Sequence, residues 1–469
     1  MKIKEESDVG AINLALDTIR KGKQALVFVN TKRSAEKTAE DISRKLKKVD
    51  VELANRVLKA LSRPTVQCRR LANCVEKGIA FHHAGLVSKQ RELIEDNFRS
   101  GNIKIICCTP TLAQGIDLPA FRAIIRDLKR FGHRGLQYIP VLEYHQIAGR
   151  AGRPSYDKYG ESICVATNQG TKEEIEEKFI NGKPEDIYSK LAVEPVLRTY
   201  LLSLIAANFV RTREQIIEFF SKTFWAYQFT DMNRLEDIID KMLMLLEEWE
   251  FINRKGGDFT SADELGNGAI KATMIGKRVA ELYIDPLTAH GFIEALREAS
   301  NKELSSFSFL QVICNTLEMK PLLRVKKKDY EDVEDAIVKY SGKFLQEEPT
   351  MYDIEYKDFL NSIKTALFME EWINERSEEE LLERYDIRPG EIRVKLDNGD
   401  WLLYAMHELC RILNFKELLK EVMKTRLRLK KGVKEELLGL LRLKNIGRVR
   451  ARRMFNNRIK TIEDVKKTD

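Results

Sequence analysis

Two arginines in the segment 146–154 (QIAGRAGRP) are the residues of this sequence best suited to chemistry. Arg150 and Arg153 lie three positions apart, which places both side chains on one face of a helical turn. Two guanidinium groups placed in this way could clamp the charge that develops on a transferring phosphoryl group. The same pair could instead bind a phosphate without catalysis, or form structural ion pairs with carboxylates of the chain.

A second glycine-containing segment, 109–120 (TPTLAQGIDLPA), directly follows an apolar run that is typical of a buried strand. Ligands of open α/β sheets bind at the carboxyl ends of the strands. Gly115, Gly149 and Gly152 would let the backbone approach a phosphate closely. We therefore expect both segments at that edge of a sheet, with 144–149 opening a helix.

The elements that must position these segments alternate between strand and helix in the first third of the chain. Short apolar runs predict strands at 24–30, 79–82, 103–108, 121–126, 136–142 and 161–167. Helical periodicity is found at 31–47, 51–61, 65–77 and 88–99. Such alternation predicts a parallel α/β sheet.

After about residue 183 the pattern becomes mostly helical. Helical stretches at 194–208, 212–222 and 233–250 precede two short strands, 251–254 and 270–274, on either side of a glycine turn, which is a winged-helix pattern. Residues 286–423 are helical, with breaks at Pro321, Pro349 and Pro389-Gly390. In the tail, 437–443 predicts a helix and a second one starts at Arg448.

A chain of 469 residues is long enough for several cores, which agrees with these changes of pattern. We expect four domains: an α/β lobe, a winged helix, a helical bundle and a basic tail, at 1–183, 184–284, 285–425 and 426–469.

The net charge of +8 is concentrated in the tail. Residues 426–469 contain fifteen Lys or Arg and five Asp or Glu, a net charge of +10, so the rest of the chain sums to −2. Clustered basic residues gain affinity for nucleic acid by releasing its condensed counterions. The tail is therefore a candidate for contact with a polyanion; the alternative is a solvated helix face.

Composition excludes several classes of protein. With 43% hydrophobic and 32% charged residues, the chain is globular and not disordered. No apolar run approaches the length of a membrane span, and the polar start has no signal-peptide core. The seven cysteines form no CxxC pair, and the pair His82-His83 has no third ligand nearby, so we expect neither disulfides nor a metal site. The cytosol is the expected location.

The two segments resemble motifs V and VI of superfamily 2 helicases. Residues 25–34 (ALVFVNTKRS) resemble motif IV, and 81–85 (FHHAG) followed by Gln90-Arg91 resembles the segment after it. With a winged helix, a bundle and a basic tail in this order, nearly the whole chain resembles the archaeal Hjm/HelQ-type DNA helicases of the Ski-like branch. The resemblance implies a multi-domain protein: a RecA-like α/β lobe, a winged helix, an α-helical ratchet bundle and a helix-hairpin-helix tail.

For the lobe, the resemblance implies that Arg150 and Arg153 are arginine fingers. The residues implied to lie near ATP, at the ribose or along the cleft, are Gly115, Asp117, Gln146 and Gly149. Asp117 stands where the archaeal branch often has Asn. Thr109 is implied to touch the DNA backbone.

Three further regions are implied to bind DNA. A hairpin within 124–142, with Phe131 and Arg134 at its tip, would split the duplex; the alternative is a plain surface turn. Arg393 and Trp401 would engage bases from a ratchet helix at 391–413, although Asn398-Gly399 interrupts its helical propensity and Trp401 could be a core aromatic. In the tail, the residues implied to flank a phosphate-binding hairpin are Arg448, Arg450 and Arg452.

A helicase of this kind also needs a first RecA-like lobe with a GxxxxGK[ST] loop and an acidic Mg²⁺-binding motif. None of the four Gly-Lys pairs of the sequence is followed by Ser or Thr, and no DExH or DEAD box occurs. We therefore expect this chain to be the C-terminal portion of an ATP-dependent DNA helicase, lacking the first lobe and inactive alone.

The expected partners are a separate first-lobe polypeptide, ATP with Mg²⁺ in combination with it, and single-stranded or forked DNA. By resemblance, translocation would be 3′→5′, at replication forks or in recombination and repair, and the chain would otherwise be monomeric. Two alternatives remain: a non-catalytic DNA-binding protein that uses the winged helix, bundle and tail, and a relative of the RNA helicases.

Overall fold

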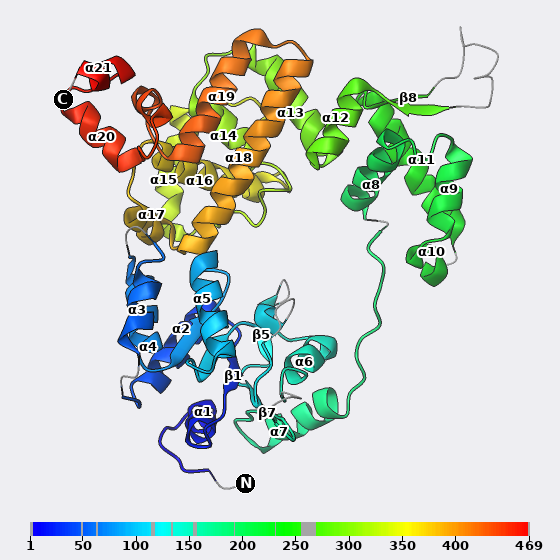
Figure 1. Ribbon diagram of the computed structural model, residues 1–469. Helices are drawn as coiled ribbons and strands as arrows, with labels where there is room; N and C mark the ends of the chain where they lie inside the picture. The colour runs from blue at the N-terminus through cyan, green and yellow to red at the C-terminus, as the bar shows by residue number, and fades with distance from the viewer. Residues whose placement is uncertain are drawn as a thin grey trace. The chain divides into compact units, whose positions relative to one another are not determined.

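The computed structural model describes residues 3–47, 50–61, 64–113, 118–132, 135–152, 157–191, 193–229, 231–254 and 269–467. The chain forms two compact units. The first comprises Met1–Ile187 and the short segment Ile387–Glu391, and the second comprises Tyr188–Asp386 and Ile392–Asp469. Figure 1 labels the elements along the chain.

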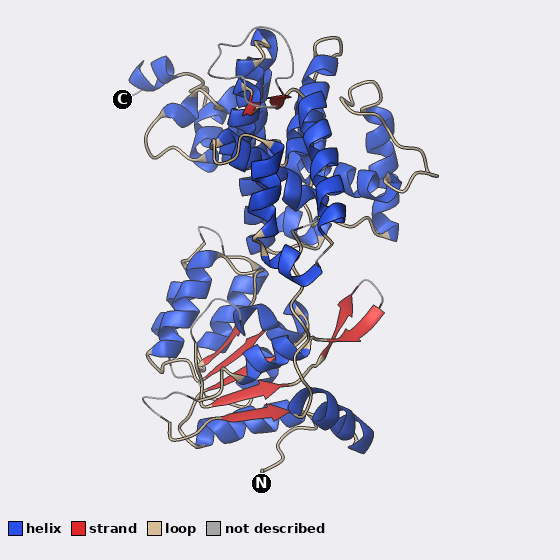
Figure 2. Cartoon of the chain, turned by 90° about the vertical axis from the view of Figure 1, so that its right-hand side faces the viewer, coloured by secondary structure: helices blue, strands red, loops and turns tan. Residues whose placement is uncertain are grey.

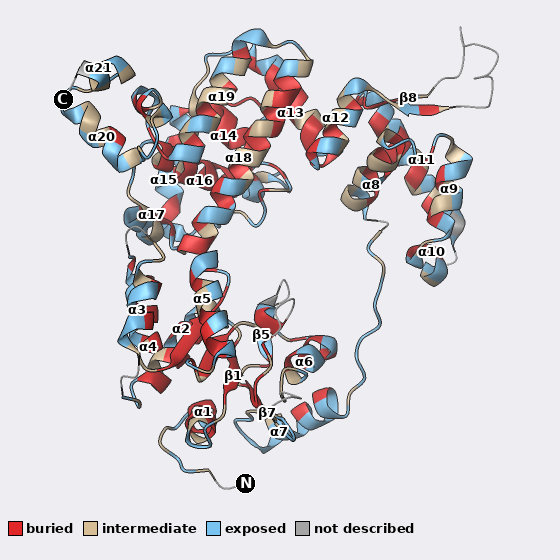
Figure 3. Cartoon of the chain, in the orientation of Figure 1, coloured by how far each residue is buried: buried red, intermediate tan, exposed pale blue. Residues whose placement is uncertain are grey.

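A parallel sheet forms the centre of the first unit. Its described strands, in spatial order, are β2 (Ile79–His82), β3 (Ile105–Cys108), β1 (Ala25–Phe28), β4 (Arg122–Ile125) and β7 (Glu161–Cys164). In register, Ala25 of β1 pairs with Ile105 on one side and Arg122 on the other. Every residue of the first four strands in this order is buried (Figure 3), as expected for a parallel sheet covered on both faces.

Helices flank this sheet (Figure 2). They are α1 (Gly10–Arg20), α2 (Lys32–Ser43), α3 (Val51–Leu58), α4 (Val66–Val75), α5 (Ser88–Arg99), α6 (Val141–Ala148) and α7 (Gln169–Ile175), which continues as a π-helix, Glu176–Ile180. A 3₁₀ turn, η1 (Pro110–Ala113), follows β3. The side chain of Thr31 caps α2 by accepting from the amide of Ser34.

Between β4 and α6 the chain forms an antiparallel hairpin. Its strands are β5 (Lys129–Gly132) and β6 (Gly135–Tyr138), with Phe131 opposite Leu136. The expected hairpin at 124–142 was too long at both ends. Its first residues belong to β4 in the central sheet, and Pro140 precedes α6, so the expected strand at 136–142 ends at Tyr138.

The second unit begins with a winged-helix arrangement. Its helices are α8 (Glu194–Ala206), α9 (Arg213–Ser221), α10 (Phe224–Phe229), α11 (Met232–Glu248) and α12 (Met274–Leu282). The expected pair of short strands is present: β8 (Ile252–Arg254) pairs antiparallel with β9 (Ile270–Ala272). A side chain at Gly276 would overlap the carbonyl oxygen of Phe251, so glycine lets α12 pack closely against β8.

The helical bundle follows. Its helices are α13 (Pro286–Ala299), α14 (Ser306–Cys314), α15 (Tyr330–Lys339), α16 (Tyr356–Ile373), α17 (Glu378–Tyr385), α18 (Pro389–Ile412) and α19 (Lys416–Lys431). α14 is buried along almost its whole length and packs against α16 and α19. The boundary expected at 425/426 falls within α19.

α18 runs unbroken through Asn398-Gly399, in agreement with the single helix expected at 391–413, although this pair has poor helical propensity. Gly399 is buried, and a Cβ there would lie 2.6 Å from Cδ2 of Leu429 on α19. Asn398 donates from Nδ2 to the carbonyl of Glu318 at 2.9 Å. Close packing of two helices therefore outweighs the poor helical propensity of this pair.

The tail has a small core of its own, formed by Val433, Leu437, Leu440 and Ala451. The expected helix at 437–443 is instead two 3₁₀ turns, Glu435–Leu437 and Leu440–Arg442, in which amides donate to carbonyls three residues back, and Leu437 and Leu440 enter this core. The helices α20 (Arg448–Asn456) and α21 (Ile462–Lys467) follow. Among the helices that the structure describes, none is long and apolar enough to cross a membrane.

Candidate nucleotide and nucleic-acid interfaces

The structure joins the two glycine-containing segments that sequence analysis singled out. The amide of Ala120 donates to the carbonyl of Arg150 at 2.9 Å, and the amide of Gly152 donates back to the carbonyl of Ala120 at 2.6 Å. The guanidinium of Arg150 in turn donates from Nη2 to the carbonyl of Ala113, in the turn η1. Ala113 and Ala120 of the first segment are therefore both bonded to the second segment.

Their position corrects the prediction that both lie at the carboxyl edge of the sheet. Thr109 follows the last residue of β3, at the carboxyl edge, whereas Ala120 comes just before the start of β4, at the amino edge. The two described ends of the segment 109–120 therefore lie at opposite edges of the sheet. Because Arg150 is bonded to Ala120, its backbone lies at the amino edge.

The helix α6 explains this difference. The chain leaves β4 at the carboxyl edge, forms the hairpin and returns along α6, which ends at Ala148. The segment 146–152 therefore closes a helix, whereas 144–149 had been expected to open one. Gly149 is the C-cap of α6, with its amide donating to the carbonyl of His145 at 2.8 Å, and Gln146 is exposed in the last turn.

Glycines let the backbone after Arg150 pack tightly. Gly152 has a φ of +95°, in the left-handed region that favours glycine. A Cβ on Gly160, just before β7, would overlap the backbone of Ala151 and Gly152. The strand β7 thus holds the segment that carries Arg150.

The other predicted residues of the lobe are only partly described. Thr109 is half-buried, and its hydroxyl lies 3.0 Å from that of Thr111. The backbone of Phe131 lies in β5, but its side chain lies outside the described residues. The remaining predicted residues, Gly115, Asp117, Arg134 and Arg153, also lie outside the described residues.

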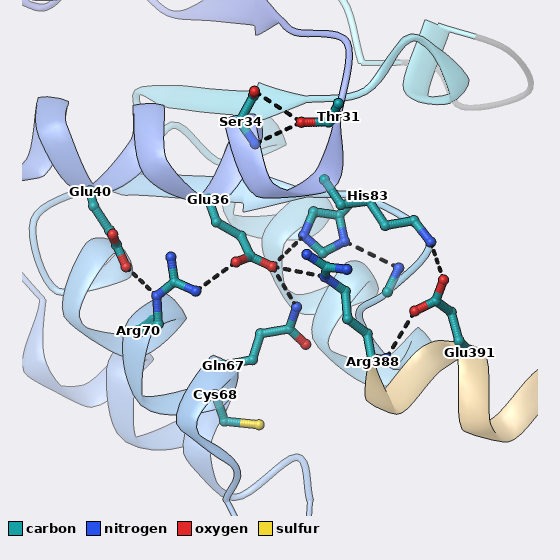
Figure 4. Close-up of polar contacts among 12 residues, drawn as sticks. Thr31, Ser34, Glu36, Glu40, Gln67, Cys68, Arg70, His83, Arg388 and Glu391 are labelled. Carbon is teal, nitrogen blue, oxygen red and sulfur yellow. Dashed lines mark hydrogen bonds and ion pairs between the residues drawn. The ribbon is translucent and has the colours of Figure 1, made fainter. Parts of the chain in front are cut away.

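Sequence analysis missed a buried carboxylate, Glu36, on α2 (Figure 4). Its oxygens accept hydrogen bonds from Gln67 at 2.8 Å, from Arg70 at 2.6 Å and from Arg388 at 3.1 Å. His83 Nε2 lies 3.2 Å from Oε1 of Glu36. These partners come from α4, from the end of β2 and from the segment before α18, so no local pattern in the sequence indicated them.

The donors keep Glu36 ionised. Burial alone would raise its pKa, but the contacts with His83 and Gln67 and the charge of Arg388 outweigh burial and hold the pKa well below its usual value. Burial lowers the pKa of His83, and the contact with Glu36 offsets this only in part, so the imidazole is neutral near pH 7. The amide of Gly85 donates to its Nδ1 at 3.1 Å, which leaves the proton on Nε2, facing Glu36.

His82 has a comparable structural contact. Its Nε2 lies 2.8 Å from Oε1 of Glu95, and burial lowers its pKa. Within the described residues, no cluster of three or more His, Cys, Asp or Glu could hold a metal ion. The pair His82-His83 therefore joins the sheet to α5 and α2 through carboxylates.

In the bundle, Arg393 and Trp401 both lie on α18. Arg393 is exposed. Trp401 is half-buried, and its Nε1 donates to the carbonyl of Leu282, the last residue of α12, at 3.0 Å. This bond fixes one edge of the indole ring against the winged helix.

Two of the three predicted tail arginines are held by the end of α16 and the loop after it. Arg452 donates from Nε and Nη2 to the carboxylate of Glu375 at 2.7 and 2.6 Å, and Nη2 also reaches Glu436 at 2.8 Å. These bonds raise the pKa of Arg452. Arg448 lies over the ring of Trp372, 4.5 Å from its centroid. Arg450 is exposed and donates to the carbonyl of Asn445 at 2.9 Å.

Three protein families match successive parts of the chain. The helicase conserved C-terminal domain matches residues 10–155, a helix-turn-helix domain matches 160–253, and domain 4 of archaeal helicases matches 307–432. These matches confirm a RecA-like helicase lobe, a helix-turn-helix or winged-helix domain and a helical domain. The helix-hairpin-helix character of the tail stays a prediction.

Curated relatives cover almost the whole chain. The ATP-dependent DNA helicase Hel308 of Methanocella arvoryzae is 40% identical over 455 residues, which is 95% of this chain and 59% of the relative. The Hel308 proteins of Methanococcus vannielii and Pyrococcus horikoshii are 37% and 39% identical over 99% and 97% of this chain, and over 65% and 62% of their own length. The sequence matches the Hel308 type of archaeal helicase.

The match to Hel308 confirms the resemblance to archaeal superfamily 2 DNA helicases. The chain spans about three fifths of the length of these Hel308 relatives. That this chain has the activity of a whole Hel308 protein is therefore a proposal.

Proposed function

We propose that this chain is the part of an ATP-dependent DNA helicase that contains the second RecA-like lobe, the winged helix, the helical bundle and the DNA-binding tail. The observation that carries the proposal is the bonded pair of segments, in which Arg150 is held against Ala113 and Ala120. The similarity of almost the whole chain to Hel308 proteins supports it.

On the nucleotide side, Arg150 and Arg153 act as arginine fingers. Their guanidinium groups stabilise the charge that develops on the γ-phosphoryl group of an ATP held by the first lobe. Gln146, Gly149, Gly115 and Asp117 line the same cleft. Since the sequence has no GxxxxGK[ST] loop, the phosphates and Mg²⁺ are held by residues outside it, on the same or a separate polypeptide.

On the DNA side, the strand passes Thr109, the hairpin with Phe131 and Arg134, and the bundle residues Arg393 and Trp401. The substrate is single-stranded or forked DNA, and the direction is the 3′→5′ direction that the resemblance implies. Thr109 and Ala120, whose amide donates to the carbonyl of Arg150, are the two ends of the segment 109–120.

In the tail, Arg448, Arg450 and Arg452 bind the DNA backbone. The contacts of Arg448 with Trp372 and of Arg452 with Glu375 compete with phosphate. DNA binding by the tail therefore requires these contacts to open, and Arg450 is the first of the three to reach the strand.

The test is DNA-stimulated ATP hydrolysis by the chain alone and after addition of a polypeptide that contains the first lobe of a Hel308 relative. We expect turnover only in the mixture, and its loss in Arg150→Ala. DNA binding by the mixture without any hydrolysis would replace this proposal with the non-catalytic DNA-binding protein.

A further inference from the structure

The first residues of α18 belong to the lobe, although they are distant from it in sequence. The segment Ile387–Glu391 groups with the first unit, and the amide of Gly390 donates to the carbonyl of Gly85 at 3.0 Å. A Cβ on Gly390 would lie closer than 3.0 Å to the backbone oxygens of Ala84 and Leu86. This close approach of two backbones requires glycine at position 390.

Two ion pairs join the same segment to α2, and Figure 4 shows the one between Arg388 and Glu36. Arg388 donates from Nε to Glu36 at 3.1 Å, and Lys32 Nζ lies 2.6 Å from Oε1 of Glu391. The other oxygen of Glu391 accepts from the amide of Arg388 at 2.9 Å, which closes the first turn of α18. Lys32 and Glu36 lie one turn apart on α2, so one helix of the lobe holds both charges.

Glu36 is well suited to hold Arg388. Its side chain is 4% exposed; Oε2 is bound by Arg70, and Oε1, which accepts from Arg388, also faces His83. A buried carboxylate that loses one of its charged partners is strongly destabilised, which opposes any separation of Arg388 from the lobe.

We propose that Glu36 and Arg388 form a latch that fixes the first turn of α18 to the lobe and so positions Arg393 for DNA. α18 runs without a break from Pro389 to Ile412, and Arg393 follows Glu391 by two residues. A helix transmits a displacement of its first turn along its axis.

This inference rests on the proposed function only for the contact between Arg393 and DNA. Glu36 and Arg388 are positioning residues, since they act through Arg393.

Arg70 offers a matched control for Arg388. Both arginines donate to Glu36 and both are partly exposed, at 35% and 26%, but Arg70 lies on α4 and its other carboxylate partner is Glu40 of α2. If Glu36 only stabilises the lobe, Arg70→Met and Arg388→Met should have the same effect. If the latch exists, only Arg388→Met should release α18.

Hydrogen exchange on the chain alone separates these cases without ATP or DNA. We expect Arg388→Met to raise amide exchange in the peptide 387–396 by about tenfold or more, and Arg70→Met to leave it unchanged. Equal changes of amide exchange in the two variants, or no change in either, would contradict the proposed latch. Lys32→Met removes an ion pair whose two side chains are about one-third exposed, so it should give a smaller rise in the same peptide, and it serves if Arg388→Met does not fold.

A double-mutant cycle with single-stranded DNA then tests the positioning of Arg393. We expect Arg393→Ala to weaken binding several-fold in the unaltered chain and much less when Arg388→Met is present. If the effects of the two substitutions on the free energy of DNA binding are strictly additive, Arg388 does not position Arg393. If Arg393→Ala has no effect in the unaltered chain, the proposed DNA contact of Arg393 fails, while the exchange measurement still decides on the latch.

Discussion

At the scale of single residues, the guanidinium of Arg150 is the described group that we expect to act on the nucleotide. It already donates to the carbonyl of Ala113, and its backbone is bonded to Ala120. A side chain held in this way loses little freedom when it meets a phosphoryl group. Electrostatic stabilisation is strongest when the donor is positioned before the reaction.

We expect Arg150→Ala to reduce kcat for ATP by ~10³-fold in a mixture with a first-lobe polypeptide, because the arginine acts on the transition state. Affinity for single-stranded DNA should change by less than about twofold. Steady-state hydrolysis and fluorescence anisotropy measure the two quantities. Arg99→Ala, which removes an exposed ion pair on α5, is the control and should change neither. Small, equal losses of turnover and DNA affinity would show that Arg150 is structural.

The buried histidines should make the stability of the lobe depend on pH. Burial lowers the pKa of His82 and of His83 below 6.5, so the folded lobe binds protons less tightly than the unfolded chain. Their contribution to stability is present above about pH 6.5 and is lost as the pH falls below it. Glu36, whose pKa is also lowered, adds to this loss only at more acidic pH.

We therefore expect the melting temperature to fall between about pH 7 and about pH 5, and to fall less in His83→Gln. The comparison concerns the slope against pH, not the absolute melting temperature. An unchanged slope in His83→Gln would contradict this account.

At the scale of elements, α18 and α19 illustrate how packing overrides helical propensity. Glycine normally weakens a helix interior, and its replacement by alanine stabilises by up to ~1 kcal/mol. At Gly399 the new Cβ would meet Cδ2 of Leu429 at 2.6 Å and Cε of Met369 at 3.3 Å. The two helices must then separate or Leu429 must change its rotamer.

We expect Gly399→Ala to lower the free energy of unfolding by ~1–3 kcal/mol, because the crowding outweighs the gain in propensity. Gly291→Ala in the interior of α13 is the matched control, since its Cβ would meet only the Nε2 of Gln346, at 3.6 Å. The control should be neutral or slightly stabilising. Urea unfolding followed by circular dichroism measures both variants; a stabilised Gly399→Ala would mean that α19 adapts without cost.

At the scale of the whole molecule, the basic tail and Trp401 should contribute to DNA binding in different ways. Residues 433–469 contain eleven Lys or Arg and five Asp or Glu. A deletion should begin at Val433, because Leu429 is buried in the bundle and its carbonyl accepts from the indole of Trp372 at 2.7 Å. A deletion that begins at residue 426 would remove part of α19 and destabilise the bundle.

We expect deletion of 433–469 to flatten the dependence of log K on log salt. The slope should fall by roughly 0.7 for each phosphate of a single strand that the tail neutralises in the unaltered chain. Trp401→Ala should instead weaken binding by roughly 1–3 kcal/mol with the slope unchanged, because stacking carries no net charge. One titration series at several salt concentrations measures both. A deletion that changes neither slope nor affinity would show that the tail charge is only solvated surface.

Local sequence patterns were sufficient to predict many of the strands and helices. The apolar runs that predicted strands contain β1, β2, β3 and β4, because the strands of a sheet covered on both faces must be apolar throughout. The pair of strands in the winged helix was also predicted. The segments 109–120 and 146–154 were recognised from their residue types alone, and the structure brings their described parts together.

Other features depend on packing that the sequence does not display. Which edge of the sheet carries Arg150 depends on the direction of α6. Whether Asn398-Gly399 breaks a helix depends on the approach of α19. Residues 437–443 look helical in isolation, but the small core around Val433 and Ala451 holds them as turns.

By itself, therefore, the sequence determined the class of the lobe and the order of the lobe, the helix-turn-helix domain and the helical domain. The residues that would meet ATP and DNA stay predictions. The tertiary structure alone decided that Glu36 faces Arg388, which lies 352 positions away. A buried carboxylate is stable only where its donors converge. That convergence depends on α2, α4, the end of β2 and the segment before α18 together, and no one of these segments shows it in its own sequence.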